Sequence, residues 1–152
     1  MAACQAPGMA PSEPVMTAEE ITTFIRGSFP GNEPWQVVEE VGPGRTVTRL
    51  PADRVVIRPG GTVSGPTLMA VADSAAWAAT LAEIGPVALS VTSHLSIHFL
   101  RKPGPGDVVA TTEMLRRGRR QAVVEVRLAT GGDPTPVATA TVTYAIPSAP
   151  PS

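Results

Sequence analysis

The chain has 152 residues, of which 43% are hydrophobic, so it can form one domain with a sizeable core. Only 4% of the residues are aromatic, so the core must consist mainly of aliphatic side chains. A net charge of −1 does not favour nucleic acid binding. The sequence contains neither a run of about 18 apolar residues nor a signal sequence, so it indicates neither a membrane span nor secretion. Cys4 is the only cysteine, which excludes an internal disulfide and a cysteine-based metal site and favours a cytoplasmic protein.

Prolines gather at both ends of the chain and predict its boundaries. Pro7, Pro11 and Pro14 lie near the start, and three more prolines follow residue 146. Such segments cannot bury enough apolar surface to become ordered. We therefore expect disordered tails at residues 1–16 and 147–152, and a single domain over residues 17–146.

The domain is predicted to begin with a short helix over residues 17–26. Thr17 is a suitable N-cap, and Glu20, three residues later, completes a capping box. A β-hairpin is predicted next, because two alternating segments at residues 36–40 and 46–50 flank a Gly-Pro-Gly turn.

Residues 65–84 predict a long helix, because Ala and Leu dominate the segment. Ser64-Gly65-Pro66 combines a cap-type residue with an early proline, and Gly85-Pro86 is a stop signal. Apolar residues occupy nearly every angular position, which indicates a helix that is buried on most sides.

Asp73 stands in the middle of this apolar helix. Aspartate is a poor residue for a helix interior and is seldom buried without a partner or a role. We therefore interpret Asp73 as a candidate functional residue. The alternative is that it shares a narrow exposed stripe with Thr80 and Glu83.

Four strands are predicted in the second half of the chain. In the first, the odd-numbered residues from Leu89 to Phe99 share one face and the even-numbered residues from Ser90 to Leu100 share the other. The next three follow glycine- or proline-containing turns and cover residues 108–115, 121–129 and 136–146. Short loops favour antiparallel neighbours, so we expect the four strands to pair in chain order as a meander.

A single helix that is apolar nearly all round needs a sheet curved around it to cover that much surface. The predicted fold class is therefore α+β, a hotdog fold in which an antiparallel sheet wraps around one long central helix at about residues 65–84.

Five segments together resemble the PaaI-type acyl-CoA thioesterases in their order and spacing. These segments are residues 61–75, Val91-Thr92, residues 96–101, Gly106-Asp107 and residues 117–119. The resemblance covers roughly residues 30–146. It implies hydrolysis of an acyl-CoA thioester to free acid and CoA, without a metal or a separate cofactor because CoA is part of the substrate. It also implies a homodimer or a dimer of dimers.

The family pattern before the helix is Asn-x-x-Gly-x-x-His-Gly-Gly, with an acid nine residues after the His. Asp73 matches the acid and Gly65 the first glycine after the His, whereas Arg58, Ser64 and Pro66 replace the Asn, the His and the last glycine. The resemblance implies that the Gly65 backbone N–H polarises the thioester carbonyl and that Asp73 acts as general base or nucleophile. Gly65 keeps its N–H, so the proline at position 66 need not abolish the oxyanion hole that the resemblance implies.

Spacing adds a deduction that does not depend on the family. Gly65 and Asp73 are eight residues apart, which is roughly 12 Å along a helix axis. They cannot both reach one thioester carbon within a subunit. A site that uses both must be shared across a two-fold dimer.

The remaining candidates are substrate-binding residues. Six basic residues lie within twenty positions at predicted strand ends: Arg101, Lys102, Arg116, Arg117, Arg119 and Arg120. We predict that Arg101, Lys102, Arg117 and Arg119 hold the CoA phosphates, the alternative being a solvated turn. Arg58, Ser64 and Trp77 are further candidate substrate contacts. For Ser64 the simpler role is that of N-cap. Trp77 either narrows the acyl pocket or belongs to the core.

Two other functions compete with hydrolysis. A hotdog hydratase would carry a His about five residues after the aspartate, where this chain has Ala78. A non-catalytic acyl-CoA-binding or regulatory hotdog protein stays open, because residues 58, 64 and 66 depart from the family pattern. The sequence leaves the acyl group open between aryl and short-to-medium aliphatic chains.

Overall fold

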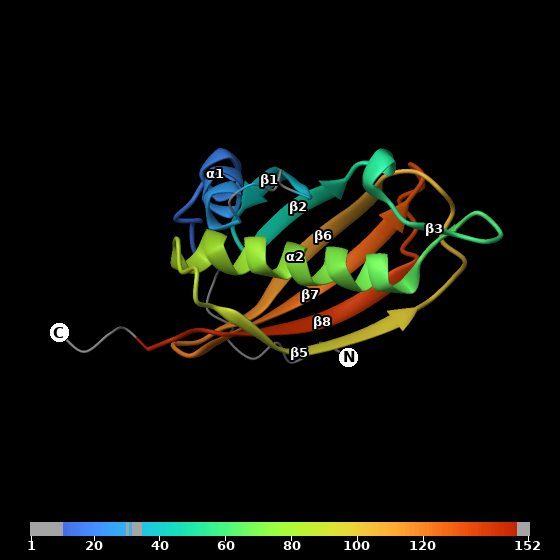
Figure 1. Ribbon diagram of the computed structural model, residues 1–152. Coiled ribbons are helices and arrows are strands. Elements are labelled where there is room, and N and C mark those ends of the chain that lie inside the picture. Colours follow the sequence, from blue (N-terminus) through green and yellow to red (C-terminus); the bar gives the residue numbers. More distant parts are fainter. Residues whose placement is uncertain (1–10, 30, 32–34, 149–152) are drawn as a thin grey trace, which may run out of the picture.

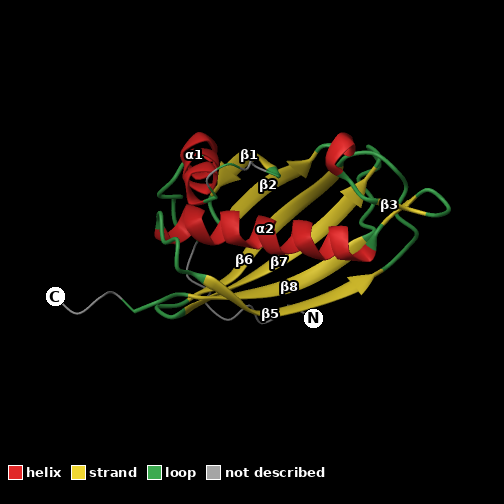
Figure 2. Ribbon diagram, in the orientation of Figure 1, coloured by secondary structure: helices red, strands yellow, loops and turns green. Residues whose placement is uncertain are grey.

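The computed structural model describes residues 11–29, 31 and 35–148. Its elements in chain order are α1 (Ala18–Ser28), β1 (Val37–Gly42), β2 (Arg45–Leu50), the short 3₁₀ helix η1 (Ala52–Arg54), β3 (Ile57–Arg58), β4 (Thr62–Val63), α2 (Gly65–Ile84), β5 (Val91–Phe99), β6 (Val108–Arg117), β7 (Gln121–Thr130) and β8 (Ala138–Ala145). Six strands form one antiparallel sheet in the order β1-β2-β6-β7-β8-β5, which curves behind α2 (Figures 1 and 2).

The predicted α+β architecture is confirmed. A single long helix at residues 65–84 lies across the concave face of an antiparallel sheet, and α1 covers one corner (Figure 1). The sequence did not predict the small two-stranded hairpin of β3 and β4, which leads directly into α2. Within the described residues, α2 and the other helices fall short of the length and apolarity that a membrane crossing requires.

The predicted meander is wrong at its first strand. β5 pairs with β8 at the edge of the sheet, and β6 pairs with β2 instead. The loop at residues 100–107 crosses the ends of β7 and β8, and the Leu100 N–H donates to the Val137 carbonyl on the way. Eight residues can span roughly 26 Å, well beyond the roughly 14 Å across three strand spacings. A short loop therefore did not require adjacent strands.

The core lies between α2 and the inner face of β6, β7 and β8. Leu68, Val71 and Ala75 of α2 are fully buried against valines such as Val126 and Val142. Alanines dominate the helix surface that faces the sheet, which lets the two layers approach closely. Packing against the sheet therefore buries most sides of α2, as its apolar sequence predicts.

One stripe of α2 remains uncovered in the single chain. Met69 and Ala70 are exposed, and Asp73, Ser74 and Trp77 are half-buried. The alternative stripe considered from the sequence is wrong, because Thr80 is 0% and Glu83 6% exposed. Asp73 therefore lies on a mostly apolar stripe that faces away from the sheet.

The local signals at the helix ends are confirmed. Thr17 and Glu20 form the predicted capping box at the start of α1. Ser64 is the N-cap of α2, and its Oγ accepts from the Thr67 N–H at 3.2 Å. Gly85 ends the helix with a φ of 90°, a conformation that favours glycine.

The N-terminal boundary of the domain is earlier than predicted. Residues 11–16 run along the C-terminal half of α2, where the Val15 N–H donates to the Ala82 carbonyl at 2.7 Å. The Ser12 hydroxyl donates to the Glu83 carboxylate at 2.7 Å, and Met16 is buried. The predicted tail at residues 1–16 is corrected for this segment, because an apolar contact and two hydrogen bonds hold it. Residues 1–10 and 149–152 lie outside the described residues.

Gly106 and Asp107, one of the segments that carried the resemblance, have structural roles. Gly106 has a φ of 126°, and a Cβ there would lie 2.8 Å from the Gly131 Cα, so only glycine fits. The Asp107 carboxylate accepts from the Ala52 N–H at 2.8 Å and pairs with Arg49 at 3.1 Å. The two residues fix the loop that crosses from β5 to β6.

Candidate active site

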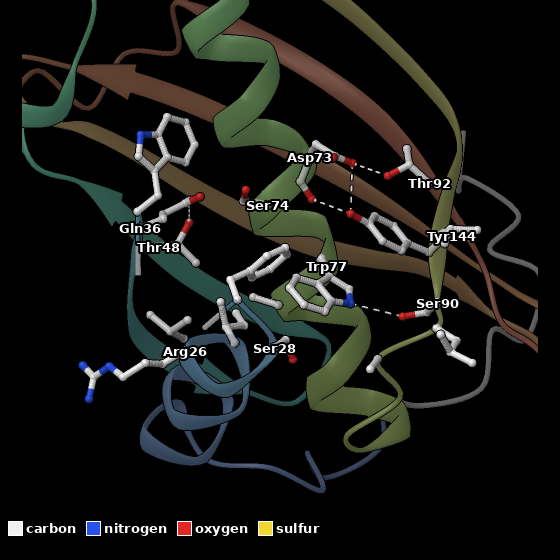
Figure 3. Close-up of a pocket in the computed structure, with 18 residues that line it drawn as sticks. Arg26, Ser28, Gln36, Thr48, Asp73, Ser74, Trp77, Ser90, Thr92 and Tyr144 are labelled. Atoms are coloured by element: carbon white, nitrogen blue, oxygen red, sulfur yellow. Dashed lines mark hydrogen bonds between the residues drawn. The ribbon is translucent and has the colours of Figure 1, made fainter. Parts of the chain in front are cut away.

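A cavity of about 1080 Å³ opens beside the uncovered stripe of α2 (Figure 3). Its walls come from α1, the middle of α2, the segments that lead into β1 and β5, and residues of the strands β1, β2, β5 and β8. Apolar side chains dominate the lining, among them Phe29, Trp35, Trp77 and Leu89. The cavity is large enough for an extended organic group, and its apolar walls favour one with a hydrocarbon or aromatic body.

Asp73 is the carboxylate of this cavity, and two hydroxyl groups hold one of its oxygens. Thr92 Oγ1 donates to Asp73 Oδ1 at 2.6 Å, and the Tyr144 hydroxyl shares its proton between the same oxygen at 3.0 Å and the Asp73 backbone carbonyl at 3.1 Å (Figure 3). Thr92 of β5 and Tyr144 of β8 are partners in the strand register. Within the described part of the chain, Oδ2 has no hydrogen bond, so one oxygen is fixed and the other is available to a ligand or water.

A β-bulge places Thr92 on the side of the sheet that faces α2. The register between β5 and β8 shifts between Thr92 and His94, so one extra residue interrupts the alternation. The sequence predicted that Thr92 shares a face with His94, Ser96 and His98. That prediction is wrong for Thr92, which instead shares the helix-facing side with Leu95.

Tyr144 is suited to remain a hydrogen-bond donor. Burial raises the pKa of its hydroxyl well above the ordinary value, the nearby Thr92 hydroxyl opposes part of this rise, and the Asp73 carboxylate raises the pKa further. The hydroxyl therefore keeps its proton at neutral pH and donates it to Asp73. Sequence reasoning did not single out Tyr144, although it is the only tyrosine in the chain.

Trp77 forms the wall of the cavity one helical turn after Asp73. Its indole N–H donates to Ser90 Oγ at 3.1 Å, and the Phe29 ring meets it edge-on with the ring centroids 5.9 Å apart. These contacts fix the orientation of the indole. Trp77 therefore lines the cavity. Its predicted effect, to narrow the space for the acyl group, stays a prediction.

Gly65 lies at the other end of the same stripe, at the first turn of α2. Pro66 has no N–H, and the N–H groups of Thr67 and Leu68 donate to the side chain and the carbonyl of Ser64. The Gly65 N–H is therefore the remaining donor of this turn, and it has no partner among the described residues. Ser64 itself is buried and engaged in capping.

The single chain does not bring Gly65 and Asp73 into one cavity. Gly65 is absent from the cavity lining that the described residues form, and a Cβ added to it would meet the Phe99 ring at 3.5 Å. Asp73 instead contacts Thr92, near the opposite end of β5. Eight residues of helix separate the two groups by roughly 12 Å.

The predicted basic cluster is divided between the two ends of the sheet, so the expectation of one cluster is corrected. Arg101 and Lys102 follow the last residue of β5, whereas Arg117 and Arg119 lie at the β6–β7 turn beside the start of β5. The nine residues of β5 separate these ends by roughly 27 Å. The two pairs of basic residues are close in sequence but far apart in space, because β6 lies between them in the chain and runs the full length of the sheet.

The predicted binding residues at these ends are all exposed. Arg101 donates from Nε to the Pro136 carbonyl at 3.0 Å, Lys102 and Arg119 lie in the loops that follow β5 and β6, and Arg117 is the last residue of β6. Arg58 lies on the exposed β3–β4 hairpin just before α2. Among the described residues, no group of three or more His, Cys, Asp or Glu side chains is placed to hold a metal ion.

Comparison with known proteins identifies the family. The family model described as "Thioesterase superfamily" matches residues 60–137, which include both Gly65 and Asp73. No match is found among curated proteins.

Solved structures agree with this assignment. A protein from a Silicibacter species, named as a candidate thioesterase, is 35% identical over 91% of this chain and 96% of its own, with a TM-score of 0.82. A mutant of the phenylacetic acid degradation protein PaaI from Thermus thermophilus is 29% identical over 74% of this chain and 93% of its own, with a TM-score of 0.61. Zebra fish thioesterase superfamily member 2, at 19% identity, shares the fold over 87% of this chain and 99% of its own, with a TM-score of 0.72. The resemblance to PaaI-type hotdog thioesterases is thereby confirmed, and the chain belongs to the thioesterase superfamily.

Proposed function

We propose that this protein hydrolyses acyl-CoA thioesters to a free acid and CoA, with Asp73 of one subunit and the Gly65 N–H of a second subunit at each site. The observation that carries the proposal is the Asp73 carboxylate at the edge of an apolar cavity, with one oxygen held by Thr92 and Tyr144. A carboxylate that is oriented in this way is suited to act on water or on a carbonyl carbon.

Two routes through Asp73 lead to the same products. As a general base, Asp73 takes a proton from water while the water oxygen attacks the thioester carbon, and the C–S bond then breaks to release the thiol. As a nucleophile, Asp73 attacks the carbon itself, displaces the thiolate as an acyl–aspartyl anhydride forms, and water then cleaves the anhydride. In both routes the carbonyl oxygen gains negative charge, which a backbone N–H at a helix N-terminus stabilises.

The exposed edge of the sheet supports a second subunit at this site. β5 is an edge strand with an exposed apolar side chain at each end, Val91 at 59% and Phe99 at 53% exposed, and Met69 of α2 is 42% exposed. An edge strand that leaves backbone groups unpaired and carries exposed apolar side chains is a typical surface for pairing with another chain. We propose that β5 pairs antiparallel with β5 of a second copy.

Such a pairing accounts for the separation of the two catalytic groups. A two-fold axis near the middle of β5, at Leu95 or Ser96, sets the Thr92 end of one strand beside the Phe99 end of the other. Because Thr92 contacts Asp73 and Phe99 lies beside Gly65, the same axis moves the donor of one subunit toward the carboxylate of the next. It also moves Arg101 toward the β6–β7 turn of the second copy, which would reunite the divided basic residues around one set of CoA phosphates.

Thiol release from a panel of aryl and aliphatic acyl-CoA esters tests the proposal. Asp73→Ala should lower kcat by at least about 10²-fold, as expected for the loss of a general base or nucleophile. The matched control is Asp53→Ala, which removes an exposed carboxylate on η1 and should leave kcat unchanged. Both variants should give the circular dichroism spectrum of the unmodified protein.

Two results would contradict the proposal. If Asp73→Ala retains most of the activity, Asp73 is not the catalytic group. If the unmodified protein binds acyl-CoA esters without releasing thiol from any of them, it is the non-catalytic binding protein that the substitutions at residues 58, 64 and 66 left open.

A further inference from the structure

Gln36 is a buried polar residue in the cavity that neither the catalytic geometry nor the packing explains. It lies just before β1 and is only 8% exposed. Its side-chain Nε2 donates to Oγ1 of Thr48 on the neighbouring strand β2. Among the described residues, its Oε1 is the only buried side-chain oxygen or nitrogen without a hydrogen-bond partner.

An unpaired buried oxygen is costly, and this one lies in the wall of a cavity. Leaving a buried acceptor unsatisfied costs about 1–3 kcal/mol, so a native structure retains such a group only for a reason. Gln36 and Thr48 line the same cavity as Asp73. Figure 3 shows the pair on the side of α2 opposite Thr92 and Tyr144, with Ser74 of α2 on their side.

The surroundings of Gln36 restrict what can satisfy it. The lining of the same cavity includes the apolar side chains of Trp35, Val38 and Phe29, so most of its surface favours a hydrocarbon or aromatic group. The amide carbonyl can only accept a hydrogen bond. A ligand that fits both features has an apolar body and a hydrogen-bond donor placed away from its thioester carbon.

We infer that Gln36 is a specificity-determining residue, which selects acyl groups that carry a hydroxyl or amide N–H donor at the end remote from the thioester. The inference rests on the proposed function, because it takes the cavity beside Asp73 as the acyl pocket. A buried site that is built to receive a donor discriminates against an analogue that lacks one, because the acceptor is then left unpaired.

Binding of non-hydrolysable analogues tests the inference without requiring turnover. The probes are acyl-CoA thioethers in which a methylene replaces the carbonyl, on an aryl and on a medium-chain aliphatic scaffold. Each scaffold ends in a hydroxyl, a methoxy or a methyl group, and Kd is measured by calorimetry. On at least one scaffold, the unmodified protein should bind the hydroxyl probe roughly tenfold or more tightly than the other two.

Two variants distinguish recognition by Gln36 from a structural role. Gln36→Leu keeps the volume but removes the acceptor, so the hydroxyl probe should bind no better than the methyl probe. Thr48→Val breaks the same Gln36–Thr48 hydrogen bond but leaves Oε1 in place, so the hydroxyl preference should persist. Equal loss of preference in both variants would mean that Gln36 only ties β1 to β2, and would overturn the inference.

The remaining outcomes are also decisive. The inference fails if no probe binds, if neither scaffold shows a preference, if the methoxy probe binds as well as the hydroxyl probe, or if Gln36→Leu keeps the preference. Thiol release from the matching thioesters is followed separately. An intact hydroxyl preference without thiol release would count against the proposed hydrolysis and would still support the role of Gln36 in recognition.

Discussion

The two ends of the uncovered α2 stripe differ in how completely one chain builds them. Around Asp73, the chain supplies two hydroxyl donors from β5 and β8, an ordered indole and an apolar cavity. Around Gly65, it supplies an N–H without a partner in the described residues, beside exposed Phe99 and Met69. The difference is what the proposed shared site requires, an acid oriented within its own subunit and a donor that serves a second subunit.

The largest effect is expected at the incomplete end. Gly65→Pro deletes the N–H and should lower kcat by roughly 10²–10³-fold, the usual cost of losing one oxyanion-hole donor. The change fits the backbone, because proline is accepted in the first turn of a helix and Ser64 already has a ψ of 146°, which a following proline requires. Steady-state thiol release measures the effect.

Gly65→Ala is the matched control at this position. Alanine keeps the N–H, and its Cβ would meet the Phe99 ring at an ordinary contact distance of 3.5 Å. The alanine variant should stay within a few fold of the unmodified protein. If both variants lose activity equally, the loss comes from the side chain rather than the N–H, and the assignment of Gly65 is wrong.

A smaller effect is expected at the complete end. Thr92→Val removes one of the two donors to Asp73 Oδ1 and should lower kcat by roughly tenfold, because a hydrogen bond to a charged group contributes about 1.5 kcal/mol or more. Tyr144 still holds the carboxylate, which limits the loss. Thr92→Ser restores the hydroxyl and should recover most of the activity. An inactive Thr92→Ser variant would show that the threonine methyl group matters instead.

The smallest effect is expected from the exposed arginines at the two ends of the sheet. Arg101→Ala and Arg119→Ala should each raise KM about three- to tenfold with little change in kcat, because contacts with CoA phosphates stabilise the substrate and the transition state equally. Arg45→Ala, an exposed arginine paired with Glu40, is the control. An unchanged KM in both test variants would mean that these arginines are solvated side chains that do not bind CoA.

Features set by neighbours in the chain were predictable from the sequence. The bounds of α2 follow from its Ala and Leu content with Ser64 and Gly85 at the ends, and Asp73 was conspicuous because an aspartate is unfavourable there. The capping box of α1 is equally local. Each of these signals lies within one element and does not depend on how the elements pack.

Features that depend on pairing between distant segments were not predictable. The position of β5 beside β8 depends on where an eight-residue loop crosses, and the bulge that turns Thr92 toward Asp73 exists only through the register of those two strands. Tyr144 and Gln36 join the cavity for the same reason. The basic residues illustrate the reverse case, because residues close in sequence lie at opposite ends of β6.

Complementation between two inactive variants tests the shared site most directly. Asp73→Ala and Gly65→Pro are unfolded together and refolded at equal amounts, with subunit exchange confirmed by native mass spectrometry of tagged chains. Each heterodimer has one site with both lesions and one intact site. Because statistical mixing makes half of the molecules heterodimers, about a quarter of the native activity should return. A mixture that stays as inactive as its parents, although both variants fold and exchange subunits, would contradict a site built from Asp73 of one chain and Gly65 of another.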